Sequence, residues 1–260
     1  MVPGHELWHL VRLEFTRAIR LYLRYPLEAV LGVGFLTLLF LAVALGVGVV
    51  ANPVTPGFDS RPDGLLIGFL CWAVVVGGTA NLGAEIEDEA RTGVLEPLFL
   101  SRYSIVTIMV ARSLSSLLAG LPVVLLLAVT VAITSGQTGA LQPKALPLLI
   151  LLDVGATGVG LAVAAVAVAF KRIRTLLIAL QLIVIYALVF PLAPASMAAL
   201  TLPVIPAVHA IREVISSAAF TPPVEFCLIA LNAVFYFAAG TAILFATVHF
   251  VKSQGRLSHY

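Results

Sequence analysis

Charged residues are scarce in this sequence. Lysine, arginine, aspartate and glutamate make up 11% of the 260 residues, whereas hydrophobic residues make up 61%. Soluble domains are roughly 25% charged, so this chain has too little polar surface to cover a water-soluble globule. The composition therefore predicts an integral membrane protein, and the net charge of +2 is too small to indicate a nucleic-acid partner.

Cysteine is also rare. Cys71 and Cys227 lie in or beside apolar runs with no CxxC spacing, which argues against a disulfide framework and against a zinc site. The five histidines are dispersed and do not converge within one apolar run, so the ligand set that an intramembrane metalloprotease needs is missing. The sequence has no GxxxxGK[ST] motif, and we therefore expect no cofactor, no ATP site and no enzymatic activity in this chain.

Long apolar runs make up most of what is present. Each is about long enough to cross ~30 Å of hydrocarbon as a helix, which predicts an all-α membrane protein with one transmembrane domain over residues 1–260. The predicted spans are 29–51, 65–84, 105–133, 145–170, 176–198 and 226–249. Prolines interrupt the fifth run, and a helical segment is expected between the fifth and sixth spans.

The segment 5–25 has the pattern of an amphipathic helix. At ~100° per residue, most of its arginines lie on one side, whereas Leu7, Trp8, Val11 and Phe15 lie on the other. Such a helix lies in the headgroup boundary of a bilayer, with its arginines toward anionic lipid. Packing against a soluble partner is the alternative interpretation.

The positive residues are sorted between the two sides of the predicted bundle. If the amino terminus is cytoplasmic, the cytoplasmic side holds all lysines and arginines except three, which are Arg61, Lys144 and Arg212. This asymmetry follows the positive-inside rule. It predicts that both termini and the segment 85–104 face the cytoplasm.

The segment 85–104 is the longest charged stretch of the chain. It lies between two apolar runs and is therefore expected to be a loop at one membrane face. An acidic part is followed by Gly93 and by a short helix-sized piece in which apolar residues surround Glu96. Such a piece presents apolar side chains and one carboxylate to a partner outside the bilayer, and a solvated linker is the alternative.

Two parts of the chain resemble ABC-2-type transporter permeases. The stretch RTGVLEPL at 91–98 is similar to the cytoplasmic loop of that family, in which an acidic run leads into a Gly-Thr-Leu-Glu-x-Leu pattern. Phe190-Pro191 followed by LPVIPAVHAIR at 202–212 resembles the family's external segment after the fifth helix. The chain departs from the usual residues at Val94, at Pro97 and at Ile205.

The resemblance implies the membrane half of an ATP-driven exporter in the plasma or inner membrane. Two permease subunits, identical or different, would form the pathway, and two separate ATPase subunits would bind ATP and Mg²⁺. The expected cargo is hydrophobic or amphipathic, such as a drug, a lipid or a glycolipid. A haem-export-type permease of cytochrome maturation, a secondary transporter and a membrane assembly factor without an ATPase are the alternatives.

The resemblance also implies roles for particular residues. Coupling to the ATPase is assigned to Glu85, Glu89, Arg91, Gly93, Leu95, Glu96, Leu98 and Phe99. The external segment is assigned Pro191, Pro206, Arg212 and Glu213. We expect replacement of Leu95 or Glu96 to uncouple transport from ATP hydrolysis.

Polar residues inside the predicted spans are the candidates for a substrate pathway, because polar groups in hydrocarbon are costly and often functional. These residues are Asn81, Asp153, Gln181, Tyr186 and Asn232. Asp153, about two turns into the fourth span, is the one acidic residue well inside a span. A hydrogen bond to a neighbouring helix is the alternative role for each.

Overall fold

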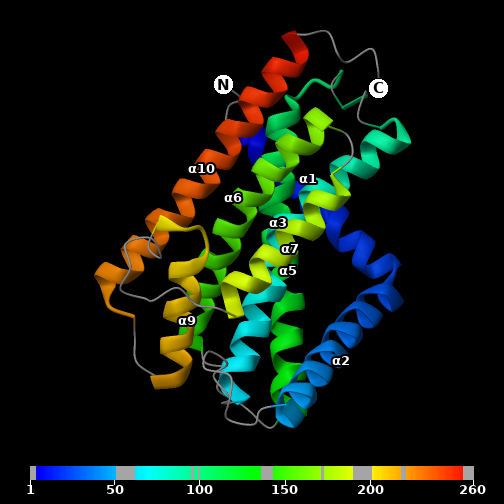
Figure 1. Ribbon diagram of the computed structural model, residues 1–260. Helices are drawn as coiled ribbons and strands as arrows, with labels where there is room; N and C mark the ends of the chain where they lie inside the picture. Colours follow the sequence, from blue (N-terminus) through cyan, green and yellow to red (C-terminus); the bar gives the residue numbers. More distant parts are fainter. Residues whose placement is uncertain are drawn as a thin grey trace.

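The computed structural model describes residues 4–50, 62–94, 97–98, 100–135, 143–170, 173–189, 201–217 and 221–253. Over these residues the chain is helical throughout, with one 3₁₀ turn and otherwise α-helices and short connections (Figure 1). The elements are α1 (Gly4–Arg24), α2 (Pro26–Val50), α3 (Pro62–Thr92), α5 (Ile105–Ser135), η2 (Pro143–Ala145), α6 (Leu146–Phe170), α7 (Arg174–Val189), α9 (Ile205–Ser217) and α10 (Pro223–Ser253).

Four helical segments are long and apolar enough to cross a membrane. They are Ile67–Thr92, Ile105–Thr130, Pro143–Phe170 and Pro223–Ser253, and they coincide with the second, third, fourth and sixth predicted spans. The described parts of α2 and α7 contain the shorter apolar stretches Val30–Ala42 and Arg174–Val184. The prediction of an all-helical fold is thus confirmed, and four helices have the length and composition of spans in a multi-pass membrane protein.

Helix α6 is the central element of the bundle and packs most extensively against α3 and α10 (Figure 1). Glycines allow the close approach. A Cβ atom at Gly158 would lie 2.5 Å from the backbone nitrogen of Phe237, and one at Gly160 would overlap the carbonyl oxygen of Gly78. Because small residues let helix backbones touch, they strengthen packing where lipid supplies no hydrophobic driving force.

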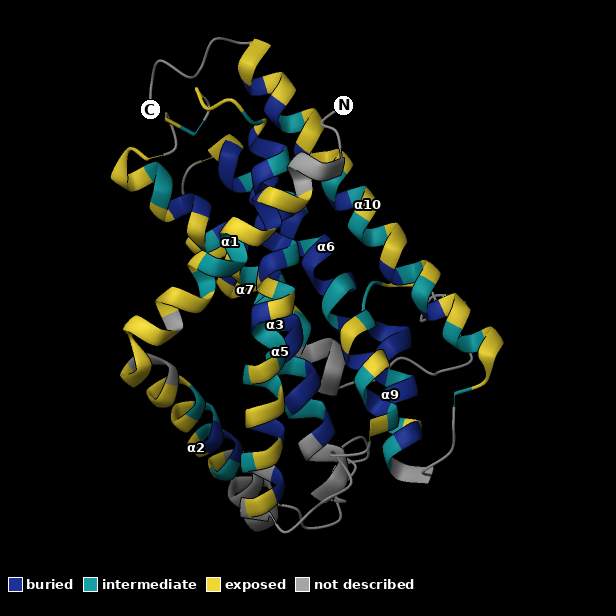
Figure 2. Ribbon diagram, turned by 180° about the vertical axis from the view of Figure 1, so that it is seen from behind, coloured by how far each residue is buried: buried dark blue, intermediate teal, exposed yellow. Residues whose placement is uncertain are grey.

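The outward faces of the bundle are apolar. Burial is concentrated along α3 and α6, whereas one face of α2 and one face of α10 are exposed (Figure 2). The exposed side chains on these two helices include Leu31, Phe35 and Leu38 of α2 and Phe235 and Phe245 of α10. Such faces suit lipid tails or a second apolar helix.

Helix α3 is longer than predicted. It continues without a break through Thr92, so residues 85–92 are helical and the prediction of a loop beginning at residue 85 is wrong. Arg91 pairs with Glu87 one turn earlier at 2.5 Å, and residues 84–92 contain no glycine or proline that would end the helix before Gly93. An acidic run of this kind ends the apolar span without ending the helix.

The other boundaries shift less. Helix α7 begins at Arg174, and the part of its predicted span beyond residue 189 lies outside the described residues, as does Pro191. Helix α10 begins three residues before the predicted sixth span and ends at Ser253. The helical segment expected between these spans is present as α9, and it lies at the opposite end of the bundle from Ser253 (Figure 1).

Helix α1 is amphipathic as predicted, but part of its apolar face packs on this same chain. Leu10 and Val11 are buried against Ala111 of α5, and the single proton of the Ser115 hydroxyl is shared between the Val11 carbonyl at 2.9 Å and the Ala111 carbonyl at 2.8 Å. Trp8 remains largely exposed. The helix therefore has one face for α5 and other apolar side chains that are free to contact lipid.

Candidate coupling site at the end of α3

Arg112 is the centre of a charged cluster that links three helices, and we call this cluster the Arg112 hub. The guanidinium of Arg112, on α5, donates to Glu89 at 2.9 Å and to Glu85 at 3.2 Å, both on α3. Glu14 of α1 lies 3.9 Å from Nε of the same guanidinium. The hub thus joins helices that are far apart in the sequence.

The Arg112 hub is mostly shielded from solvent, so the pairing of its charges affects stability. The side chain of Arg112 is 8% exposed, Glu89 14% and Glu14 17%, whereas Glu85 is 49% exposed. Charged groups that are removed from water must be paired, because an isolated buried charge costs several kcal/mol. The arginine therefore holds α3 and α5 together at this end of the bundle.

The hub is not fully hydrogen-bonded. Among the described residues, Nε of Arg112 and Oε2 of Glu89 are buried without a hydrogen-bond partner. An oxygen of Glu14 lies 3.9 Å from Nε, which is too long for a hydrogen bond. Glu14 is thus within ion-pair distance of Arg112 but does not complete the hydrogen bonding of its guanidinium.

Glu87 makes a second link at the same end of α3. Its carboxylate is buried and accepts hydrogen bonds from the Arg91 guanidinium and from the backbone N–H of Ile173, the latter at 3.3 Å. Ile173 directly precedes α7, and a carboxylate at a helix amino terminus is stabilised by unpaired N–H groups and by the helix dipole. The end of α3 is therefore tied to α7 as well as to α5.

Gly93 ends α3 in a left-handed conformation. Its φ is +74°, a value that glycine adopts at little cost. The N–H of Val94 bonds to the carbonyl of Glu89 at 3.0 Å, which is the long backward hydrogen bond of a Schellman-type helix end. The chain thus turns sharply directly after the Arg112 hub.

The short helical piece expected after Gly93 is described in part. Pro97 and Leu98 are helical, and the N–H of Leu98 bonds back to the Val94 carbonyl at 3.4 Å. Val94 and Leu100 are exposed, Leu100 at 81%. The expected coupling residues Leu95, Glu96 and Phe99 lie outside the described residues.

The acidic residues assigned to coupling do not all face outward. Glu85 and Glu89 turn toward Arg112, and Arg91 turns toward Glu87. The sequence-based assignment missed Arg112, Glu14, Glu87 and the N–H of Ile173. Arg112 could have been found, because it is a charged residue inside the predicted span 105–133, where a buried partner of opposite sign is expected.

The segment predicted to be external has a strained turn before α9. Val204 has a φ of +74°, and the N–H of Ile205 bonds to the Pro203 carbonyl at 2.8 Å, which together form a γ-turn of the rare positive-φ kind. Tyr236 and Asn232 of α10 bracket this turn, because they donate hydrogen bonds to the carbonyls of Thr201 and Leu202 at 2.6 and 3.4 Å.

Helix α9 docks its apolar face on α3 and α6. Val208 and Ile211 are buried in one cluster with Cys71 and Leu152. Pro206, in the first turn of α9, is buried, Arg212 is half-buried and Glu213 is exposed. The predicted external residues that the structure describes therefore belong to a helix that covers one end of the bundle.

The predicted pathway residues do not converge. Asn81 is exposed on α3, and Gln181 is half-buried on α7. Asn232 binds the turn before α9. Tyr186 belongs to α7, and its side chain lies outside the described part of the structure.

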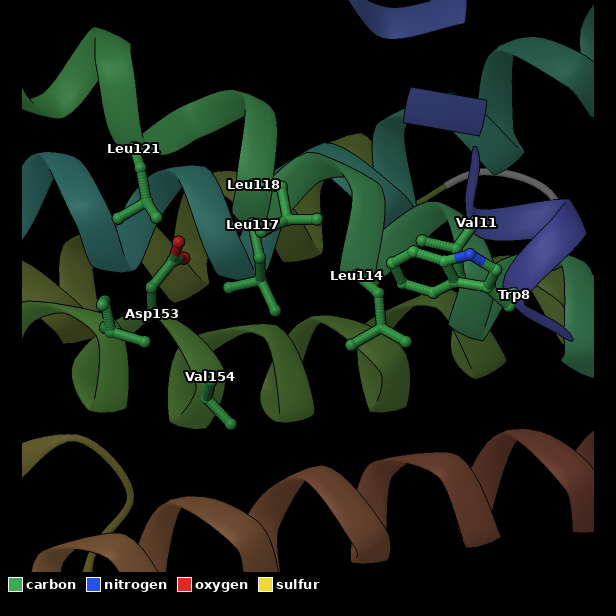
Figure 3. A pocket seen from close by; sticks show the side chains of 9 residues that line it. Trp8, Val11, Leu114, Leu117, Leu118, Leu121, Asp153 and Val154 are labelled. Atoms are coloured by element: carbon green, nitrogen blue, oxygen red, sulfur yellow. The ribbon is translucent and has the colours of Figure 1, made fainter. Parts of the chain in front are cut away.

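Asp153 occupies a different setting. It lines a pocket of about 350 Å³ between α1, α5 and α6, and its carboxylate points toward Leu117 and Leu121 of α5 (Figure 3). The other lining residues are apolar or aromatic: Trp8, Val11, Leu114, Leu117, Leu118, Leu121, Ile150 and Val154.

Comparison with known proteins adds no family. No protein-family model matches the chain, and no curated protein matches its sequence. The resemblance of the two segments to ABC-2-type permeases accordingly stays a prediction from the residues.

Proposed function

We propose that this chain is the permease subunit of an ATP-driven exporter whose ATPase is a separate protein. The observation that carries the proposal is the juxtaposition at the end of α3, where a turn with exposed apolar side chains follows directly on the Arg112 hub. The turn offers a contact for a partner, and the hub offers a route by which movement of the turn reaches several helices.

Exposed apolar side chains in the turn support the partner contact. Val94 and Leu100 flank the short helical piece and are exposed. Because charged residues surround them, these apolar side chains face water and not lipid in the proposed orientation. Burial of apolar side chains at an interface removes them from water and favours association. A groove on the ATPase that accepts these side chains would bury them.

The hub supports transmission. A coupled device requires contacts that differ between two states. The pairing of Arg112 with Glu85 and Glu89 fixes α3 to α5, and α1 packs on α5 through Leu10 and Val11. Tilting of the end of α3 by the ATPase would therefore shift α1 and α5 together.

Charge distribution supports a cytoplasmic position for this end. This end of the bundle holds four basic residues at or just beyond helix ends: Arg91, Arg102, Arg174 and Lys252. Lys144 lies at the other end of the bundle, at the start of α6. By the positive-inside rule, the richer end faces the cytoplasm. The proposed protomer has six spans, with α2 and α7 as the first and fifth, and both termini in the cytoplasm.

The outward apolar faces support a dimer and a hydrophobic cargo. Helices α2 and α7 expose rows of large apolar side chains, among them Phe35, Leu38, Leu182 and Ile183. In the proposed assembly a second permease subunit, identical or different, covers some of these side chains, and the pathway between the subunits carries a drug, lipid or glycolipid.

The test is purification from native membranes in a mild detergent. We expect a stoichiometric protein with a GxxxxGK[ST] motif and ATP hydrolysis in the purified complex. The Leu100→Ser variant should lose the co-purifying ATPase. Leu202 is an exposed leucine before α9 at the opposite end of the bundle, and the Leu202→Ser variant should keep the ATPase. Purification of the chain without any ATPase, together with ATP-independent transport, would contradict the proposal.

A secondary transporter is the second candidate, and Asp153 favours it. The pocket that holds this carboxylate is otherwise apolar, and acidic residues inside spans often bind a coupling proton or cation. Transport driven by an ion gradient in vesicles without ATP would select this candidate. Dependence on ATP and on a second protein would select the exporter.

A further inference from the structure

The pocket between α1, α5 and α6 is separate from the Arg112 hub. Its lining runs along α5 from Leu114 to Leu121, which corresponds to about 10 Å of helix at 1.5 Å per residue. Trp8 lies at one end of this row and Asp153 at the other (Figure 3). The volume of about 350 Å³ is within the range of small-molecule sites.

The carboxylate of Asp153 is unpaired within the part of the chain that the structure describes. None of the described residues forms a hydrogen bond or an ion pair with its carboxylate. A carboxylate in apolar surroundings is costly unless a donor or a cation pairs with it. The only donor in this lining is the indole N–H of Trp8, at the other end of the pocket, so a bound molecule with a positive group would supply the partner that the carboxylate lacks among the described residues.

The chemistry of the lining defines that molecule. Leucine, isoleucine and valine side chains suit an alkyl or aliphatic body. A carboxylate selects a positive group, and Trp8, at the other end of the row, adds an aromatic surface for the apolar body. An anionic amphiphile would meet repulsion from Asp153, and a neutral one would leave the carboxylate unpaired.

We propose that this pocket binds an amphiphilic organic cation, with its ammonium group on Asp153 and its apolar body along Leu114, Leu117 and Leu121. The site lies within one protomer and requires neither a dimer nor an ATPase. It is therefore independent of the proposed function, since binding can be measured on the purified chain without ATP and without transport.

Trp8 provides the assay. The chain has two tryptophans, so Trp72→Phe leaves Trp8 as the single fluorophore. The full chain in nanodiscs of neutral phosphatidylcholine is titrated with octylammonium at neutral pH, and the emission of Trp8 is followed. Octan-1-ol has the same alkyl chain without charge and serves as the probe control.

Variants separate the pocket from partitioning into lipid. Asp153→Asn removes the charge, and Asp153→Glu keeps it. Asp88→Asn makes the same change at an exposed carboxylate of α3. Leu117→Phe narrows the pocket and leaves Asp153 in place.

The inference predicts a saturable response to octylammonium in the parent, in Asp88→Asn and in Asp153→Glu. Binding should weaken about tenfold or more in Asp153→Asn, as for loss of a hydrogen bond to a charged group, and similarly in Leu117→Phe. Octan-1-ol should bind the parent at least tenfold more weakly than octylammonium.

Three results would overturn it: equal affinity in Asp153→Asn and Asp88→Asn, equal affinity for octan-1-ol and octylammonium, or no saturable change of Trp8 emission in the parent. If Asp153→Asn does not purify as a folded protein, unchanged affinity in Leu117→Phe overturns the inference by itself.

Discussion

Replacement of Arg112 by methionine tests the hub directly. Methionine keeps much of the length of the side chain but removes its charge and its donors. Glu89, 14% exposed and 2.9 Å from the guanidinium, then loses its partner. Glu85 is about half exposed and can be solvated instead, so most of the effect comes from Glu89.

The distances set the expected magnitude. At 2.9 Å and an effective dielectric constant of about 20, two unit charges attract by about 6 kcal/mol. The cost of removing both groups from water offsets several kcal/mol of this attraction. Breaking one side of a buried pair typically costs about 3–5 kcal/mol, and we expect Arg112→Met to lower the free energy of unfolding by this amount.

A double-mutant cycle isolates the pair. The free energy of unfolding is measured in mixed dodecylmaltoside and SDS micelles for Arg112→Met, Glu89→Gln and the double variant. The double variant should lose about 1–3 kcal/mol less than the sum of the single losses. Arg17→Met is the matched control, because Arg17 is 53% exposed in its pair with Glu14 and should cost at most about 1 kcal/mol.

Two results would refute the reasoning. One is a loss in Arg112→Met no larger than the loss in Arg17→Met. The other is an additive cycle, with a coupling energy below about 0.5 kcal/mol, which would mean that Arg112 and Glu89 do not stabilise each other.

Three further substitutions test the packing in the same unfolding assay. Gly160→Ala should lower the free energy of unfolding by about 1–3 kcal/mol, because it overpacks α6 against α3. A Cβ at Gly120 meets nothing within 4 Å, so Gly120→Ala should be neutral or stabilising. Equal effects of the two substitutions would contradict the close approach of α6 to α3. Ser115→Ala should lower the free energy of unfolding by about 1 kcal/mol and speed hydrogen exchange in α1. The Ser116 hydroxyl bonds only within α5, so Ser116→Ala should not change hydrogen exchange in α1. Val204→Gly should raise stability by up to about 1 kcal/mol by relieving the positive φ, and a loss would show that the turn is unstrained.

The apolar pattern predicted the helices well, because a run of about 20 apolar residues admits few structures in a membrane. It placed α5 and α6 closely and anticipated α9. It misplaced the end of α3, because apolarity marks where a span leaves the hydrocarbon and not where a helix stops. The helix stops at Gly93, whose positive φ is the physical signal for termination.

The site was less accessible to sequence reasoning. Glu85 and Glu89 were recognised as important, but their partner is 23 or more residues away on another helix, and pairing across helices depends on their rotation and register. The same holds for Glu87 and the N–H of Ile173. Asp153 was singled out as a charge within a span, yet only the packing of α1 on α5 and α6 creates the pocket around it.

The central claim is that the end of the bundle formed by the turn after α3 binds a separate ATPase. A photo-crosslinking amino acid at position 100, with one at position 202 as the control, measures this contact in native membranes. We expect a cross-link from position 100 to a protein with a GxxxxGK[ST] motif and none from position 202. A position 100 that forms no such cross-link, or that reacts with a membrane-impermeant reagent from outside the cell, would contradict it.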